Sequence, residues 1–181
     1  MSCKRRMLAF AVMLIAACFF GACVDTPPQP DEIPAQADEN LSPGYIREDL
    51  GVALALLDAY LEESGAGEIG IAMIQGMDVN LIGNARTWLI GAYSGTETRW
   101  YIYSDEIWKT MNWPAPVPAS IISLNETALP SEVYTENNAV IRGIMEEMGT
   151  DKSDLELTAE GYWITIRNAT DIADLHYDAS I

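Results

Sequence analysis

The chain has 181 residues and carries 10 Lys and Arg against 27 Asp and Glu, so its formal net charge is −17. This acidity argues against nucleic acid as a partner, because binding to phosphates requires clustered basic side chains. The three Cys all lie in the N-terminal segment that ends at Cys23, and only one His is present. Neither a disulfide nor a thiolate zinc site is therefore expected in the rest of the chain. An apolar content of 49% is sufficient for a folded core.

Residues 1–23 have the features of an export signal. Lys4, Arg5 and Arg6 precede an uncharged apolar run over residues 7–24. Basic residues followed by an apolar stretch that ends in small residues are typical of such signals. The run is also close to the minimum length of a membrane-spanning helix, so an uncleaved N-terminal anchor is the alternative. With either interpretation, the chain that follows is extracytoplasmic.

The Cys residues in this segment indicate lipidation. Bacterial and some archaeal lipoprotein signals end in a lipobox, in which a small apolar tripeptide precedes the lipidated Cys. Residues 15–18 (IAAC) resemble this pattern at every position, and residues 20–23 (FGAC) resemble it less well at the first. We favour Cys23 because the apolar run ends there, whereas processing at Cys18 would leave two Phe on the mature N-terminus. An ordinary cleaved signal with incidental Cys is the alternative.

Residues 24–44 are predicted to form a disordered tether. They contain five Pro and five Asp or Glu. Pro prevents regular structure and the acidic side chains repel one another, so an extended spacer is expected. The remaining residues, 45–181, carry 7 basic and 22 acidic side chains, a net charge of −15. This predicted domain is itself acidic, which also disfavours binding to anionic lipid.

Two helices are predicted in this domain, and strand signals follow each of them. Leucines at helical spacing predict the first helix over residues 46–63, with Gly65 or Gly67 at its C-terminal end. The second is predicted over residues 131–148, after Pro130 and before Gly149. Residues 113–118, which are rich in Pro, are expected to form an extended linker. Strands are predicted over residues 68–75, 87–93, 98–103, 119–124, 154–157, 162–167 and 174–178, with a hairpin turn at 94–97.

We therefore expect an α+β fold made of two units, residues 45–112 and 113–181. In each unit an amphipathic helix would pack on an antiparallel meander. Short matches between the units indicate a duplication: residues 61–65 match 145–149, and residues 87–90, which contain Trp88, match 162–165, which contain Trp163. A chance match is the alternative.

This succession of helix, Trp-containing strand and aromatic-Asp strand resembles PepSY-type domains, which occur in tandem in exported lipoproteins and in peptidase propeptides. The resemblance spans roughly residues 46–181. The family's Asp-Gly turn is absent, and Ser94-Gly95 and Ala169-Thr170 occupy its place. The resemblance implies a non-catalytic binding or inhibitory module outside the cell, and it transfers no catalytic residue. The residues that carry it are 88–90 with 101–105, and 163–164 with 177–178.

The sequence offers little for catalysis. A Ser or Cys nucleophile needs a positioned base, and the only His is His176. Gly65-Ala66-Gly67 lacks the spacing of a phosphate-binding loop. Neighbouring acids on the predicted helices, such as Glu62 and Glu63, point in different directions. We therefore expect no enzyme and no cofactor; the alternative, a carboxylate-dependent hydrolase, would require two buried acids that face each other in a cleft.

One candidate metal site is present near the C-terminus. On a strand, Asp174, His176 and Asp178 would project from one face, and three such side chains can hold a divalent ion. This pattern makes a metal-binding surface sensor an alternative function. A strand with its polar side toward solvent would give the same pattern.

Aromatic residues cluster between the predicted third strand and the linker. Such a group forms either part of the core or, if exposed beside acids, a surface that stacks on sugars or receives a peptide. The residues of this predicted binding surface are Trp100, Tyr101, Tyr103, Trp108 and Trp113.

Three glycosylation sequons begin at Asn40, Asn125 and Asn168, and each can accept a glycan if it is exposed. This number exceeds chance and favours an archaeal or otherwise glycosylated cell surface. The leading hypothesis is a membrane-tethered lipoprotein of the cell surface or periplasm. It would act as a binding, inhibitory or accessory module and engage a protein or peptide through a sheet edge or the aromatic surface.

Overall fold

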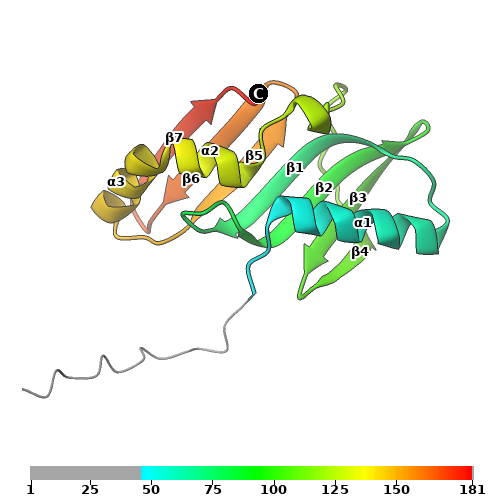
Figure 1. Ribbon diagram of the computed structural model, residues 1–181, viewed down its shortest axis with the longest axis horizontal. Helices are drawn as coiled ribbons and strands as arrows, with labels where there is room; N and C mark the ends of the chain where they lie inside the picture. The colour runs from blue at the N-terminus through cyan, green and yellow to red at the C-terminus, as the bar shows by residue number, and fades with distance from the viewer. Residues whose placement is uncertain (1–45, 181) are drawn as a thin grey trace, which may run out of the picture. The chain divides into compact units, whose positions relative to one another are not determined.

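The structure is a computed structural model that describes residues 46–180. The predicted export segment and tether, with Cys18, Cys23 and Asn40, lie outside the described residues. Within the described part, no helix is both long enough and apolar enough to span a membrane. Three α-helices and one antiparallel sheet of seven strands confirm the expected α+β fold (Figure 1).

The elements follow one another in two groups, each with its helices before its strands. In chain order they are α1 (Leu50–Ser64), β1 (Gly70–Val79), β2 (Ala85–Ser94), β3 (Glu97–Ser104), β4 (Ile107–Met111), the short 3₁₀ helix η1 (Leu124–Glu126), α2 (Pro130–Glu136), α3 (Asn138–Met148), β5 (Ser153–Thr158), β6 (Gly161–Arg167) and β7 (Ile172–Tyr177).

The sheet has the strand order β4-β3-β2-β1-β5-β6-β7, and every neighbouring pair is antiparallel. Each group of strands is a meander, and the two meanders meet where β1 pairs with β5. In Figure 1, α1 lies in front of the half formed by β2, β3 and β4, and α2 and α3 lie in front of the other half. The helices thus cover one face of the sheet.

The first helix forms as its leucine spacing predicts. Leu50, Leu57 and Leu61 are buried in the main core beneath it. The helix begins later than expected because Glu48 is extended and exchanges two backbone hydrogen bonds with Ala85 of β2, at 2.8 and 3.1 Å. The Asp49 side chain then caps the helix by accepting a hydrogen bond from the Gly51 N–H, and Gly65 ends the helix in the left-handed conformation.

The second predicted helix is interrupted, which corrects the expectation of one helix over residues 131–148. Asn137 has φ −103° and ψ 14°, and it separates α2 from α3. Its side-chain amide donates a hydrogen bond to the Val133 carbonyl at 2.9 Å. The same carbonyl also accepts the Asn137 backbone N–H at 3.1 Å, and Asn side chains that bond locally to the backbone in this way favour helix ends.

Two expectations about strands are wrong. The predicted strand at 119–124 is not one: Ile122 donates a single hydrogen bond to the Ile71 carbonyl, and the chain then enters η1. Conversely, β4 was not expected. It lies at an edge of the sheet and buries only Trp108, whose indole N–H donates to the Ala53 carbonyl of α1 at 2.8 Å. A strand with one buried side chain lacks the alternation that sequence patterns detect.

A second, smaller core lies on the sheet face opposite the helices. Residues 113–118, the expected extended linker, cross this face as a strap. The Trp100 indole N–H donates to the Ala115 carbonyl, and the Tyr93 hydroxyl donates to the Val117 carbonyl. Gly91 makes room for Trp100, since a Cβ at Gly91 would lie 3.0 Å from the indole. The core beneath the strap therefore involves only β1, β2, β3 and the end of β4.

The alignment that pairs Trp88 with Trp163 is not consistent with the two faces of the sheet. Trp88 is fully buried beneath the helices, whereas Trp163 is 44% exposed on the opposite face. A shift of one residue would pair Trp88 with Tyr162, which also faces the main core. Because strand side chains alternate between faces, the original alignment would turn each strand over. The duplication itself stays a prediction.

Two buried tyrosines differ in how their hydroxyls are satisfied. The Tyr134 hydroxyl is 2.6 Å from the Ser153 hydroxyl, and burial raises the pKa of Tyr134. The Tyr103 hydroxyl is buried and has no hydrogen-bond partner among residues 46–180. A buried hydroxyl without a partner costs free energy, whereas a satisfied one contributes a modest net stabilisation.

We expect Tyr134→Phe to lower the free energy of unfolding of the full-length chain by about 1 kcal/mol, because the buried hydrogen bond between the Tyr134 and Ser153 hydroxyls is lost. Tyr103→Phe serves as the matched control and should leave this free energy unchanged or raise it by up to about 1 kcal/mol. Urea denaturation followed by tryptophan fluorescence measures both. Equal losses in the two variants would contradict this assignment of the hydroxyls.

The β3–β4 turn stores backbone strain. Asp105 and Glu106 both have positive φ, 51° and 64°, as the two central residues of a type I′ hairpin turn require. Neither is Gly, so each carries the steric cost of the left-handed region.

Glu106→Gly should therefore raise the free energy of unfolding by about 0.5–1 kcal/mol, the left-handed penalty less the entropic cost of Gly. Gly95 in the β2–β3 turn has φ 64° and open space where a Cβ would lie, so Gly95→Ala should lower the same free energy by a similar amount. Thermal denaturation of both variants measures these opposite changes. A shift of the unfolding midpoint in the same direction in both variants would contradict the assignment of strain to the left-handed residues.

Candidate functional site

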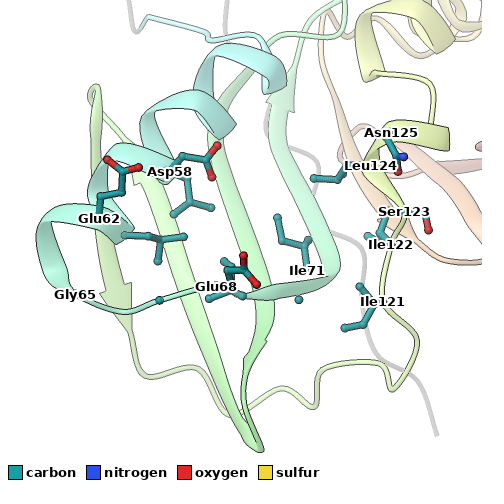
Figure 2. Close-up of a pocket in the computed structure, with 15 residues that line it drawn as sticks. Asp58, Glu62, Gly65, Glu68, Ile71, Ile121, Ile122, Ser123, Leu124 and Asn125 are labelled. Atoms are coloured by element: carbon teal, nitrogen blue, oxygen red, sulfur yellow. The ribbon is translucent and has the colours of Figure 1, made fainter.

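A cleft of about 1000 Å³ opens on the helix side of the sheet. It lies between the C-terminal half of α1, the chain that leads into β1, and residues 121–125 (Figure 2). We call it the acidic cleft. Its lining residues are Leu57, Asp58, Leu61, Glu62, Gly65, Gly67, Glu68, Ile69, Gly70, Ile71, Ile121, Ile122, Ser123, Leu124 and Asn125.

Three local features of the sequence build this cleft. Gly65 ends α1, and the chain turns there toward the sheet. This turn forms one end of the cleft. The hydrogen bond from the Ile122 N–H to the Ile71 carbonyl, 2.7 Å long, attaches the opposite wall to the start of β1. Gly70 permits this close approach, because a Cβ there would lie 2.8 Å from the Ile121 side chain.

The cleft has an apolar floor and an acidic rim. Leu57, Leu61, Ile71 and Ile122 form the floor, and all are at least nine-tenths buried. The exposed carboxylates stand around it: Figure 2 shows Asp58 and Glu62 on α1 and Glu68 on the chain before β1. No Lys, Arg or His is among the described lining residues. The cleft therefore favours a ligand that combines apolar surface with positive charge.

The described residues around the acidic cleft give no support to the hydrolase alternative. No Asp or Glu among residues 46–180 is buried, so no pair of buried carboxylates supports the hydrolase alternative. Ser123 lines the cleft, but His176 lies on β7 and stacks on Trp163 of the neighbouring strand. Ser123 thus has no imidazole beside it as a base.

The predicted metal ligands each have another role. The Asp174 carboxylate accepts a hydrogen bond from the Thr165 hydroxyl at 2.7 Å, and His176 stacks on Trp163 with ring centroids 4.2 Å apart. Asp178 lies beyond the end of β7, and hydrogen bonds from Ser180 lower the pKa of its carboxyl. Within residues 46–180, no group of three His, Cys, Asp or Glu is placed to hold a metal ion.

The predicted aromatic binding surface requires correction. Trp100, Tyr101, Tyr103 and Trp108 are buried, with at most 4% of their surface exposed. Trp100, Tyr101 and Tyr103 are buried because β3 lies between two strands, with α1 over one face and the strap over the other. Trp108 of the edge strand β4 is buried against α1, where its indole N–H donates to the Ala53 carbonyl. Only Trp113, which is 44% exposed, can contribute to a surface.

Two of the predicted glycosylation sites are exposed. Asn125 lies in η1 at the edge of the acidic cleft, so a glycan attached there would stand beside the opening. Asn168 follows β6, and its side-chain amide donates to the Met148 carbonyl at 3.0 Å. A glycan on Asn168 would compete with this contact between the β6–β7 loop and α3.

The sequence pattern does not identify the acidic cleft. It places Glu62 with Glu63 on a solvated helix face, and it singles out neither Asp58 nor Glu68. The available signal is the spacing of Asp58 and Glu62, four residues apart beside Leu57 and Leu61. No family model, curated protein or solved structure matches this chain.

Proposed function

We propose that this chain is a membrane-tethered, extracytoplasmic binding module without catalytic activity, and that its acidic cleft receives a protein segment carrying apolar and basic side chains. The observation that carries the proposal is the combination, in one cleft, of an apolar floor with three carboxylates and no basic side chain among the described lining residues. The PepSY resemblance, which implies a binding or inhibitory module, agrees with it.

The floor supplies the affinity in this proposal. A cleft of about 1000 Å³ is at the upper end of the range for small-molecule sites, so it admits several side chains of an extended segment. Apolar surface that such a segment buries against Leu57, Leu61 and Ile71 gains roughly 25 cal/mol per Å² before the cost of ordering the segment.

The rim supplies the selectivity. Asp58, Glu62 and Glu68 are exposed, so each contributes only modestly to affinity, but together they attract a basic segment and repel an acidic one. The net charge of −15 over residues 45–181 acts in the same direction at longer range. Binding should therefore weaken as the salt concentration rises.

The test uses the full-length chain in lipid nanodiscs and short fluorescent peptides that alternate Leu with Lys or Leu with Glu. We expect the Leu/Lys peptide to bind and the Leu/Glu peptide not to bind. The combined substitution Asp58→Asn, Glu62→Gln and Glu68→Gln should weaken binding about tenfold, since three exposed ion pairs at about 0.5 kcal/mol each are lost. Fluorescence anisotropy measures these affinities.

The control removes the same number of charges elsewhere. Glu146 and Glu147 on α3 and Glu160 in the β5–β6 turn are exposed and do not line the acidic cleft. Changing these three residues to Gln should leave the affinity within about twofold of wild type. Equal weakening by both sets of substitutions would mean that the peptide responds only to net charge, and the proposed site would be rejected.

The tether is tested separately at the N-terminus. Mass spectrometry of the mature protein, purified from membranes of an expressing bacterium, should find lipid on Cys23 as the first residue. Cys23→Ser should then abolish lipid attachment, whereas Cys18→Ser should not. A mature N-terminus without lipid, or one that begins at Cys18, would contradict the preferred site.

A further inference from the structure

The half of the sheet that the strap leaves uncovered carries a second concave site. Trp163 of β6 and Met77 of β1 are 44% and 42% exposed there. Because side chains alternate along a strand, this face is opposite the helices and the acidic cleft. A hollow of about 460 Å³ lies on it, which we call the sheet-face hollow. Its lining residues are Gln75, Gly76, Met77, Asp154, Leu155, Glu156, Trp163, Thr165, Arg167 and Asp174.

Strand register brings these side chains together from four strands. Gln75 pairs with Glu156, Glu156 with Trp163, and Trp163 with His176, so these four residues form one row across β1, β5, β6 and β7. A second row beside it consists of Asp154, Thr165 and Asp174. The sheet thus holds an aromatic ring and several polar groups at fixed spacings.

The tryptophan ring is braced from one side. The rings of Trp163 and His176 are stacked at a tilt of 37°, with centroids 4.2 Å apart. Trp163 lines the hollow, whereas His176 does not. His176 therefore supports one side of the indole, and Trp163 presents its remaining surface to the hollow as an apolar plate.

The polar side chains around the Trp163 ring are held in pairs by hydrogen bonds, and each pair keeps oxygen atoms that can still accept hydrogen bonds from a ligand. The Gln75 amide donates to Glu156 Oε2 at 2.9 Å, which leaves the Gln75 carbonyl oxygen and Glu156 Oε1. The Thr165 hydroxyl donates to Asp174 Oδ1, and Arg167 pairs with Asp154. Amide and carboxylate oxygens accept hydrogen bonds in the plane of the group, and the pairing fixes that plane.

We propose that the sheet-face hollow binds a neutral pyranose sugar. A pyranose has an apolar C–H face, which would lie on Trp163, and hydroxyls around its edge, which would donate to Gln75, Glu156 and Asp174. Three carboxylates against one guanidinium disfavour phosphates and acidic sugars. A volume of about 460 Å³ is in the range of sites for small ligands, which favours a sugar over a folded protein.

Isothermal titration of the full-length chain in lipid nanodiscs tests this proposal, with oligosaccharides of glucose, galactose, mannose and N-acetylglucosamine as probes. We expect at least one of them to bind, and glucuronic acid and adenosine not to bind. Trp163→Ala should weaken sugar binding about tenfold, the size expected when an aromatic stacking surface is lost. Gln75→Ala should weaken it by a smaller factor, about threefold, because one hydrogen bond is lost.

Trp113→Ala is the matched control. Trp113 is also 44% exposed but does not line the hollow, so this variant should bind the sugar as wild type does. The thermal unfolding midpoint of each variant establishes that it is folded. Absence of binding by all the neutral sugars, unchanged affinity in Trp163→Ala, equal loss in Trp113→Ala, or binding of adenosine in place of a sugar would each overturn the proposal. The acidic-cleft substitutions should not affect sugar binding, so the two sites are tested independently.

Discussion

The pairing of β1 with β5 is the interaction on which the rest of this fold depends. Each meander on its own would have two open edges and one apolar face covered by a short helical layer. Pairing at β1 and β5 removes one edge from each and makes a single sheet with one continuous main core. Ser153, at the start of β5, also bonds to the Val79 carbonyl at the end of β1 and to Tyr134 of α2. The same junction thereby connects the second helical layer to the first meander.

Both candidate sites follow from how this long sheet is covered. The two helical layers cover separate halves of one face, and the acidic cleft opens beside α1 where residues 121–125 cross toward the second layer. On the opposite face, the core beneath the strap of residues 113–118 extends only over β1, β2, β3 and the end of β4. The sheet-face hollow lies on the part that it does not reach. A sheet of seven strands thus has more surface than its covering segments can bury.

Local patterns predicted much of the fold because they act over a few residues. The leucine spacing located α1, Gly65 and Gly149 located two helix ends, and residues 94–97 located a hairpin turn. The interruption at Asn137 escaped prediction because it depends on the bond that the Asn137 side chain makes to the backbone of the preceding turn. The strand β4 escaped it because an edge strand with one buried residue has no clear period.

The candidate sites were harder to predict because they depend on tertiary contacts. Trp100 and Tyr103 belong to the same aromatic cluster in the sequence as Trp113, yet of these three only Trp113 is exposed. The difference arises because α1 and the strap cover the two faces of β3. Asp174 and His176 do project from one face of a strand, as expected. Sequence could not reveal that Trp163 of the adjacent strand stacks on His176 and that Thr165 binds Asp174.

The extended residues before α1 would be the first part of the domain to bear a force that pulls on the chain from its N-terminal side. Glu48 holds β2 by two backbone hydrogen bonds, its carbonyl also accepts the Trp88 indole N–H, and Arg47 pairs with Asp78 at 2.7 Å. These contacts precede α1 in the chain, so a pull from the N-terminal side reaches them before it reaches the helix. The bonds at Glu48 would be strained together, and α1 is shielded until they fail. If the N-terminal side of such a domain were attached to a membrane, a pulling force would load the contacts of Arg47 and Glu48 first. The helix α1, which forms one wall of the acidic cleft, would keep its shape until they broke.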